Sequence, residues 1–533
     1  MRKTKRLHLL ESLEHRFALT GDVGVTVVSG DLIVTGDTLD NQIEIRQLSY
    51  GNYEITGQAG TLINGAPSFL AKRVRDDFSI DMAQGGADAV KLIGALRVPD
   101  RLDVVMGHGG DLQILGTTGV LRIGGVVDIH SAAPGDSFDL MILDQVRFDE
   151  KVSLTGCDFL LIQSQGQLVG PTFDGTLTVK SCEDMEIRSF EQSIGPRFEE
   201  AVILGDDSLI DTFDVSIGSY QDSVGPRFDG LLQMVMGESA WIESSDRSIG
   251  PRFEGPVRVR SGDSVRIESH DDSTGPRFDE PVDAWAAINV VVQSHHASTG
   301  PQFRAAVTFE PADDVFVFSH DDSRGATFYG KSTFVTGVGV VVWSAENSVG
   351  PVFLGKVDMK TGYDVSISSR DTSVGPSFRQ PLTIAATTDV YIDAWENSVG
   401  PSFYAAVRID AGTSVYIGSI FDATGPTFKA PLTIAAGEDL SIQRFAGTVT
   451  AASASFTQLT ATVGGNALLA SARFSRAVTI QMADDDNLLR VVDSIFAKLL
   501  RADGGLGADT FEDGFNNIFT GGMKVTNFET MLP

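Results

Sequence analysis

A four-residue pattern, Gly-Pro-x-Phe, recurs along this chain with a period of about 25 residues, and this recurrence constrains the fold more than any other feature. Its glycine, called the repeat glycine below, stands at positions 170, 195, 225, 250, 275, 300, 350, 375, 400 and 425. The copy at Gly325 keeps the phenylalanine but has Ala326 in place of proline, and one step, from Gly195 to Gly225, is longer than the others. Copies in such near-constant phase indicate a repeat array.

Each repeat contains two segments in which apolar and polar residues alternate. Apolar residues stand ten and eight positions before the repeat glycine, as at Val265 and Ile267, and a serine stands six positions before it, as at Ser269. Two more apolar residues follow the glycine by seven and nine positions, as at Val257 and Val259. Alternation with period two, rich in Val and Ile, predicts β-strands. The short segment around the phenylalanine adds a third strand.

Three short strands and three corners within one repeat predict one coil of a parallel β-helix. Leucine-rich repeats of this length need Leu and Asn positions that are missing here, and a propeller blade needs about forty residues. We therefore expect an all-β, right-handed parallel β-helix, that is, a solenoid, with the hand set by strand twist. Roughly seventeen coils stacked about 4.8 Å apart would form a rod on the order of 80 Å long.

Stacking turns each repeat position into a column of equivalent side chains. The phenylalanine column is expected inside, where each buried ring contributes roughly 1.5–3 kcal/mol. The serine column shares the inner strand face and predicts a hydroxyl ladder along one corner, because each hydroxyl both donates and accepts. The residues that define the structural repeat include Gly225, Gly250, Gly275, Gly300, Gly350, Phe228, Phe253, Phe278, Phe303 and Phe353.

The pattern weakens toward both ends of the chain and predicts five regions. These are a basic tail (1–20), a β cap made of hairpins (21–85), irregular early coils (86–169), regular repeats (170–446), and shorter terminal coils with a C-terminal cap (447–533). Caps matter because an open coil end is an exposed sheet edge. The long step before Gly225 predicts an acidic inserted loop near residues 206–214, which is either a grafted functional loop or a tolerated insertion.

The net charge of −30 argues against nucleic acid as a partner, because a phosphate backbone needs a basic surface. An acidic surface is typical of an extracellular or ion-rich setting, and equally of a surface kept soluble by charge. At 42% hydrophobic residues the chain can bury a core. Its sequence contains no apolar run of about 18 residues, so we expect no transmembrane helix.

The first residues, MRKTKRLHLLESLEHRFAL, combine a basic start with leucines at helical spacing. They lack the apolar stretch of an ordinary signal peptide and predict either a short amphipathic helix or a frayed tail. The string LLESLEHRFAL closely resembles the N-terminal motif of planctomycete extracellular proteins, in which a basic start leads into an L-E-x-L-E-x-R segment. This resemblance covers only the first 19 residues. It implies export or a cell-surface address and nothing about activity.

Histidines stand five positions before the repeat glycine in three consecutive coils: His270, His295 and His320. The next position in the same coils holds Asp271, His296 and Asp321. Imidazoles and carboxylates a few ångströms apart are the ligands of zinc and copper, so these residues are candidate metal ligands. Other coils place a bulky residue such as Tyr220 in the histidine column. Stacked surface side chains therefore remain an alternative, as do pH sensing and catalysis.

Acidic residues stand three or four positions before most repeat glycines. Like charges about 5 Å apart repel by roughly 1 kcal/mol in water, so we expect counter-charges. The arginines two positions after the glycine are expected to pair with this acidic column in four coils: Arg197, Arg227, Arg252 and Arg277. Later coils lack them, which leaves calcium or solvated charge as the alternatives.

One segment matches the nonapeptide calcium repeat G-G-x-G-x-D-x-U-x at every fixed position. It is GGLGADTFE, residues 504–512, and it predicts Asp509 as a calcium ligand. Such sites are built by two successive turns, and MAQGGADAV, residues 82–90, is a degraded second copy.

The only two cysteines, Cys157 and Cys182, stand one repeat period apart at equivalent repeat positions. Coil stacking places their Cα atoms about 4.8 Å apart, within the range that a disulfide needs. In an exported protein this predicts a disulfide, with two free stacked thiols as the alternative.

Two middle coils place apolar residues at outward positions beside the histidine column: Phe316, Phe318, Val341 and Trp343. A contiguous exposed apolar strip often marks a partner or ligand surface. A flanking segment that covers the strip is the alternative.

These features favour a secreted or surface-attached solenoid with a structural or adhesive role and no catalysis. No cofactor is required, calcium is possible, and the expected partners are cell-surface or matrix components, glycan or protein. The alternative is a polysaccharide lyase or glycoside hydrolase on a β-helix scaffold. Such an enzyme needs carboxylates placed as acid and base, or calcium with a basic residue. Near-equal coils supply no singular constellation of that kind apart from the coils that carry the histidines.

Overall fold

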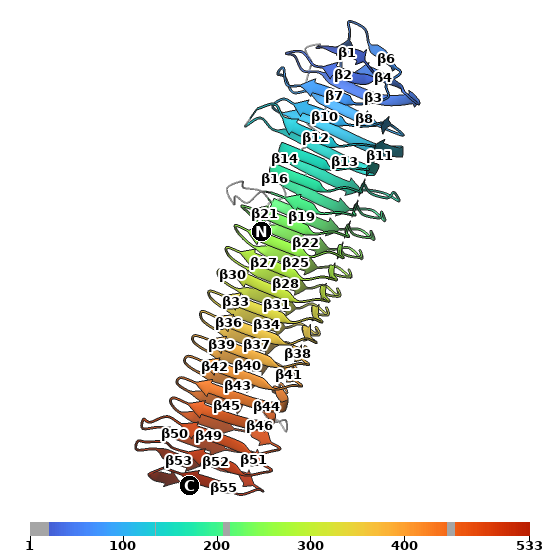
Figure 1. Ribbon diagram of the computed structural model, residues 1–533. Helices are drawn as coiled ribbons and strands as arrows, with labels where there is room; N and C mark the ends of the chain where they lie inside the picture. Colours follow the sequence, from blue (N-terminus) through green and yellow to red (C-terminus); the bar gives the residue numbers. More distant parts are fainter. Residues whose placement is uncertain (1–20, 134, 206–213, 445–453) are drawn as a thin grey trace. The chain divides into compact units, whose positions relative to one another are not determined.

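The computed structural model describes residues 21–133, 135–205, 214–444 and 454–533, and the predicted N-terminal tail and the inserted acidic loop at 206–213 lie outside them. The described residues form β-strands and no helix, so they contain no helical membrane span. The chain divides into two compact units, unit 1 (1–213) and unit 2 (214–533). Each unit is a stack of parallel coils (Figure 1), and together they contain about 17 turns. The prediction of an all-β parallel solenoid is confirmed.

Unit 1 begins with antiparallel strands. The pairs are β1 (Asp22–Val28) with β2 (Asp31–Thr35), and β4 (Asn52–Gly57) with both β3 (Gln42–Ser49) and β6 (Ser68–Lys72). The antiparallel pairs that the structure describes in unit 1 all lie between residues 22 and 72. This hairpin layer covers the open edge of the first coils.

The rest of unit 1 consists of parallel strands. β2 pairs with β7 (Phe78–Met82) and β3 with β8 (Ala89–Ile93), which joins the hairpins to the coils. The following strands are β10 (Leu102–Met106), β11 (Gly110–Ile123), β12 (Val127–Ser131), β13 (Phe138–Phe148), β14 (Val152–Ser164), β15 (Thr172–Phe173), β16 (Leu177–Ser189), β17 (Arg197–Phe198) and β18 (Val202–Leu204).

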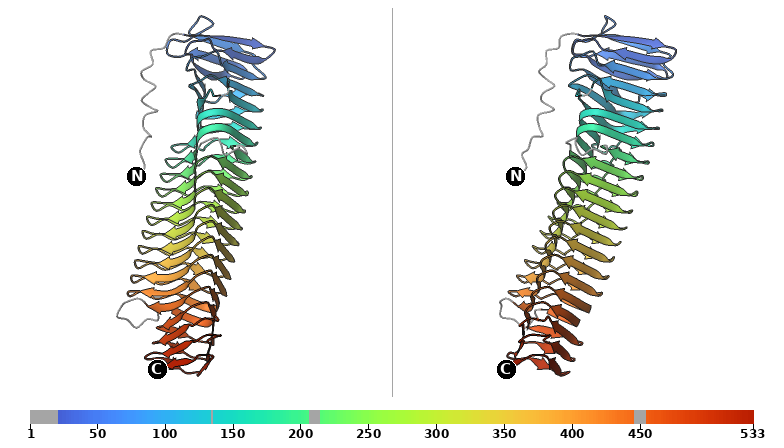
Figure 2. Two further views of the ribbon diagram at one scale, coloured as in Figure 1. Left: turned by 90° about the vertical axis from the view of Figure 1, so that its left-hand side faces the viewer. Right: turned by 60° about the vertical axis from the view of Figure 1, so that its left-hand side comes forward.

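Unit 2 contains the regular coils, seen from the side in Figure 2 in green to orange. One coil consists of a two-residue strand, β23 (Arg252–Phe253), and two five-residue strands, β24 (Val257–Ser261) and β25 (Val265–Ser269). Each strand pairs in parallel with its equivalent in the next coil, as in Val257↔Val282. The predicted three strands per coil are confirmed.

The third strand of each coil carries the functional candidates described below. In successive coils of unit 2 these strands are β19 (Asp214–Ser219), β22 (Ala240–Ser244), β25, β28 (Val290–Ser294), β31 (Val315–Ser319), β34 (Val340–Ser344), β37 (Val365–Ser369), β40 (Val390–Trp395) and β43 (Val415–Ile420).

The phenylalanine column forms a stack of aromatic rings that runs through the core from coil to coil. The rings of Phe253, Phe278 and Phe303 are fully buried and stack in sequence, with centroids 4.7 and 4.9 Å apart. The repeat glycines allow the coils to approach closely at the neighbouring corner. A Cβ atom added at Gly275 would lie 2.7 Å from backbone atoms of the next coil, which is too close for any side chain.

The predicted serine ladder is also present, and a second serine column completes it. Ser269 is fully buried, and its Oγ lies 3.1 Å from the Oγ of Ser298, which stands two positions before the next repeat glycine. Ser298 in turn donates to the carbonyl oxygen of Ser269 at 2.9 Å. One coil has Ala394 in the first column, and Ala423 occupies the matching position of the second column, so both hydroxyls are lost together.

Between the two serine columns the backbone makes a tight turn in the regular coils. The residues four and three positions before the repeat glycine have left-handed φ angles, for example 51° at Asp271 and 60° at Asp272. Asp and Asn adopt this region more readily than other residues that carry a Cβ. Backbone geometry therefore accounts for much of the acidic column.

Candidate functional site

The histidine ladder consists of His270, His295 and His320, which follow directly after β25, β28 and β31. These strands pair in register along their last residues, Ser269, Ser294 and Ser319, so that the three imidazoles lie one above another. The rings of His295 and His320 are parallel with centroids 5.1 Å apart. The rings of His270 and His295 are perpendicular with centroids 3.6 Å apart.

At one end of the ladder the carboxylate of Glu268 contacts His270. Its Oε2 lies 3.0 Å from Nε2 of His270, and Nδ1 of His270 lies 3.3 Å from Nδ1 of His295. The Glu268 side chain is only 6% exposed. Burial raises the pKa of this carboxyl, but the hydrogen bond and the charge of His270, the neighbouring Gln293 amide and the charge of Arg266 outweigh burial and lower the pKa overall. A buried, ionised carboxylate therefore lies against two imidazoles.

The middle imidazole is held in its neutral form. Burial lowers the pKa of His295 to about 4, and the neighbouring imidazoles of His270, His320 and His296 act in the same direction. His295 also lies close to His296, with their Nδ1 atoms 3.1 Å apart. At neutral pH one ring nitrogen therefore has a lone pair that can accept a hydrogen bond or coordinate a metal ion.

At the other end His320 contacts an exposed acidic turn. Nδ1 of His320 lies 2.8 Å from Oδ2 of Asp321, and Nε2 of His296 lies 3.4 Å from the same oxygen. Hydrogen bonding with Glu346 lowers the pKa of Asp321 and raises that of Glu346. Asp271 contacts His296, with its Oδ1 3.1 Å from Nδ1 of that ring.

The described residues contain four groups of three side chains whose ligand atoms lie within 4.8 Å of one another. Two of these groups share His295 and are formed by Glu268, His270 and His295, and by His295, His320 and Asp321. The other two lie in unit 1: Asp103, Asp128 and His130, and Asp76, Asp77 and Asp100. Of the six candidate metal ligands in this region, the structure thus groups four and leaves out Asp271 and His296.

Sequence reasoning missed Glu268. It stands two positions before His270, and alternation along a strand places residues two apart on the same face. The sequence prediction compared one repeat position at a time from coil to coil. It therefore did not consider Glu268 and His270 together. Combining adjacent outward columns would have identified it.

The predicted apolar strip continues the ladder. The rings of Phe318 and Trp343 stack with centroids 5.2 Å apart, and His320 stacks on Phe318 at 5.7 Å. Phe316, Phe318, Val341 and Trp343 are each half-buried. More exposed apolar side chains occupy a column that sequence reasoning did not single out, directly before the repeat glycine. This apolar ridge comprises Val224 and Ile249 and, after three coils that carry Thr274, Thr299 and Arg324 in the same column, Val349, Val374 and Val399. The five apolar residues are 42–54% exposed.

The expected pairing of arginines with the acidic column is wrong. Arg252 pairs with Glu254 at 2.7 Å and Arg277 with Asp279 at 2.8 Å, so the partners stand four positions after the repeat glycine. The reason is local, because residues two apart on the short strand segment share its outward face. The acidic turn lies outside this network.

Asp509, the predicted calcium ligand, is fully buried. Its Oδ1 accepts a hydrogen bond from the backbone nitrogen of Asn487 at 2.9 Å, and its Oδ2 has no hydrogen-bond partner. Asp88 in the degraded copy has the same environment: Oδ1 accepts from the nitrogen of Asn41 at 2.7 Å and Oδ2 lacks a partner. Among the side chains that the structure describes, neither aspartate belongs to a group of three closely spaced metal-ligating residues.

The cysteines lie in register on two adjacent strands of unit 1, β14 and β16. Their Cα atoms are 4.5 Å apart, and the structure joins Cys157 and Cys182 in a disulfide. Both are 1% exposed.

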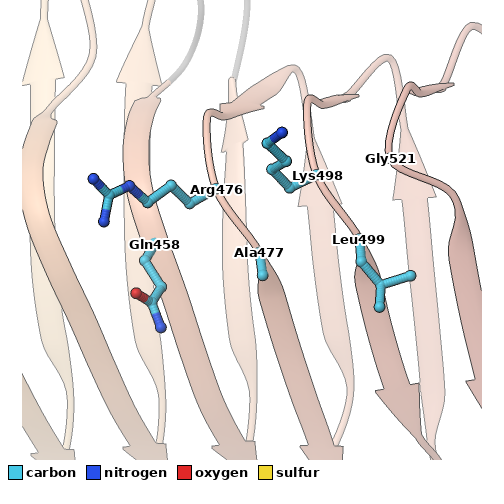
Figure 3. A pocket seen from close by; sticks show the side chains of 6 residues that line it. All are labelled: Gln458, Arg476, Ala477, Lys498, Leu499 and Gly521. Carbon is cyan, nitrogen blue, oxygen red and sulfur yellow. The ribbon is translucent and has the colours of Figure 1, made fainter.

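An open groove of about 690 Å³ crosses the terminal coils of unit 2 (Figure 3). It lies where the chain enters β46 (Ala454–Val463), β49 (Val478–Met482), β52 (Leu500–Asp503) and β55 (Met523–Thr526). The residues that line it are Gln458, Arg476, Ala477, Lys498, Leu499 and Gly521. Arg476 extends toward the strand that carries Gln458 (Figure 3), which makes the groove locally basic.

Comparisons of the chain with protein-family models, curated proteins and solved structures gave no match.

Proposed function

We propose that this chain acts as a secreted or surface-attached, non-enzymatic solenoid with a structural and adhesive role. The observation that carries the proposal is the uniformity of unit 2. Its regular coils repeat the same three strands around a buried phenylalanine column, while the outward columns differ from coil to coil. Such a repeat array is a rigid spacer that presents an extended surface to partners.

The surfaces that we assign to adhesion are the apolar ridge and the apolar strip beside the histidine ladder. The ridge residues Val349, Val374 and Val399 lie in three consecutive coils and pair through isolated β-bridges, which aligns them. Exposed contiguous apolar surface is typical of a binding site for a partner. The partners that we propose are cell-surface or matrix components, glycan or protein.

Two observations support an address outside the cell. The paired arrangement of Cys157 and Cys182 suits an oxidising compartment. The resemblance of the first residues to planctomycete extracellular proteins implies export in the same way.

We further propose that calcium stabilises the acidic turns. A neighbouring carboxyl, Asp321, raises the pKa of Glu346 through a hydrogen bond, and Asp371 does the same to Glu396. The charge of Arg370 favours the ionised form of Glu396 but only partly offsets the effect of Asp371. Carboxyls that lie this close repel one another when ionised, and a bound cation that prefers oxygen ligands would relieve that repulsion.

The proposal is tested by binding the purified full chain, immobilised on beads, to panels of matrix proteins and of neutral and anionic polysaccharides. The informative variant is Val349→Ser/Val374→Ser/Val399→Ser, and Val335→Ser/Val338→Ser is the matched exposed control. We expect a partner whose binding falls at least ~tenfold with the ridge variant and is unchanged with the control.

The same samples are incubated with uronic-acid polymers, and the polymer length is followed. Depolymerisation that disappears with His295→Ala would replace the proposal with a glycan-active enzyme. Binding that is equal for the ridge variant and the control would show that the ridge is not adhesive.

A further inference from the structure

We propose that Glu268, His270 and His295 bind a first-row transition-metal dication such as Zn²⁺. This site goes beyond the proposed adhesive role and does not depend on it. The three side chains each offer one ligand atom, and these atoms already lie within 4.8 Å of one another. They come from two adjacent strands, β25 and β28, whose register the parallel ladder fixes. Metal binding therefore needs side-chain rotation and no movement of the backbone.

The spacing of the two imidazoles suits a tetrahedral ion. Nδ1 of His270 and Nδ1 of His295 are 3.3 Å apart. Zn–N bonds of about 2.0–2.1 Å give a tetrahedral edge of about 3.3–3.4 Å between two ligand atoms. The two nitrogens therefore stand at the separation that a shared ion requires. Glu268 contacts the other nitrogen of His270, Nε2, so its carboxylate must rotate to join them on one ion.

Glu268 supplies a negative charge and an oxygen that can bind a cation. Its side chain is 6% exposed, and its Oε1 is buried without a hydrogen-bond partner. The nearest cation is Arg266, whose Nη1 lies 3.5 Å from this oxygen and whose side chain is 43% exposed. That distance is too long for a hydrogen bond, so Arg266 compensates the charge only loosely. A buried carboxylate with a free oxygen beside two imidazoles is an incomplete coordination sphere.

The second group at the ladder is the weaker candidate. Its Asp321 already contacts both His296 and His320 and is hydrogen-bonded with Glu346. Its side chain is 34% exposed, compared with 6% for Glu268.

A set of two nitrogens and one oxygen favours zinc, copper or nickel over calcium or magnesium, which prefer oxygen ligands.

The test is titration of Zn²⁺ into the chelator-stripped full chain, by calorimetry and by competition with a chromophoric chelator. We expect saturable binding of one ion for each chain. Glu268→Gln preserves the shape of the side chain and should weaken binding by about tenfold or more. Arg266→Gln removes the competing cation and should strengthen it. Thermal melting of each metal-free variant verifies that the coils are intact.

His320→Ala is the matched control, because it removes a histidine of the same column that belongs only to the second group. We expect this variant to bind Zn²⁺ like the unmodified chain. Absence of saturable binding would overturn the proposal. Loss of binding in His320→Ala together with unchanged binding in Glu268→Gln would overturn it as well, and would place the ion at Asp321. None of these outcomes bears on adhesion through the ridge.

Discussion

The buried serine pair Ser369 and Ser398 offers a quantitative test of how the coils are held together. Ser398 Oγ donates to the carbonyl oxygen of Ser369 at 3.1 Å and accepts from the backbone nitrogen of Trp395 at 3.2 Å. The two hydroxyl oxygens are 3.0 Å apart. Both side chains are at most 1% exposed, so water cannot replace a lost partner. The energy of each hydroxyl therefore depends on the presence of the other.

The two single substitutions should have different costs. Ser398→Ala removes every bond of the corner hydroxyl and leaves the Ser369 hydroxyl buried without its partner, which costs about 1–3 kcal/mol. Ser369→Ala removes one hydrogen bond while Ser398 keeps its bond to the carbonyl, which costs about 0.5–1.5 kcal/mol. The double substitution leaves no orphaned hydroxyl. It should cost less than the sum of the two, with a coupling on the order of 0.5–1.5 kcal/mol.

The next coil supplies the matched control. There Ala394 and Ala423 occupy the same two positions, both at most 1% exposed, so this coil is a natural double variant. Ala394→Ser alone should not stabilise this coil, because it buries a hydroxyl whose hydroxyl partner is missing. Adding Ala423→Ser should then raise the stability, because the second hydroxyl completes the pair.

The assay is equilibrium denaturation followed by the fluorescence of Trp395, with the other three tryptophans replaced by Phe in all samples. A probe beside the pair is needed because repeat arrays can lose coils in stages. Strictly additive costs, or an Ala394→Ser variant more stable than its parent, would refute the idea that the two serine columns act as coupled pairs.

Further predictions concern the disulfide, a buried carboxyl and calcium. Replacing Cys157 and Cys182 by Ser should lower the stability of unit 1 by about 3 kcal/mol, because the loop-closure entropy of a disulfide over this sequence separation has about that magnitude. Reductant should reproduce the loss in a thermal melt of the unmodified chain. Burial raises the pKa of Asp88 from 3.8 to about 6, so the folded state holds its proton more tightly. Stability of unit 1 should therefore fall as the pH rises from about 4 to 6, and the Asp88 share of this loss is on the order of 1–3 kcal/mol. Asp88→Asn should remove that share in denaturation curves across the window, while Asp139, whose pKa burial also raises to about 6, keeps its own. Calcium titration of the chelator-stripped chain should show saturable heat and a raised melting temperature, and Asp509→Asn should reduce both. No heat and an unchanged melt would mean that the acidic columns are solvated and bind no calcium.

The inner columns could be predicted from the sequence because they repeat. A position that faces the core of a solenoid meets the same neighbours in every coil, so the same residue satisfies it each time. The phenylalanines, the serines beside the tight turns and the paired cysteines are of this kind. Their period shows which residues are equivalent from coil to coil. The spacing of paired strands then places Cys157 beside Cys182.

The contacts between neighbouring columns could not be predicted in the same way. Arg252 has acidic residues on two sides, and only the shared face of the short strand selects Glu254. Glu268 looked like an ordinary polar residue of an outer face, because its burial depends on the bulky side chains of the adjoining column. The division at residues 213 and 214 coincides with the long step before Gly225. That step predicted only a loop, because the repeat continues on both sides of it.

The contrast between inner and outer columns indicates where a function can reside on such a scaffold. Substitution of an inner residue disturbs its equivalents in both neighbouring coils, so inner columns are kept alike, and where one member changes its partner changes with it, as at Ala394 and Ala423. Outer columns are free of this constraint, and a run of unusual residues in consecutive coils therefore needs a reason of its own. Three histidines in succession, joined by a buried carboxylate from the neighbouring column, form such a run. Because coil spacing brings equivalent atoms to within a few ångströms, three side chains from two coils suffice to surround an ion, and no loop has to be added to the repeat.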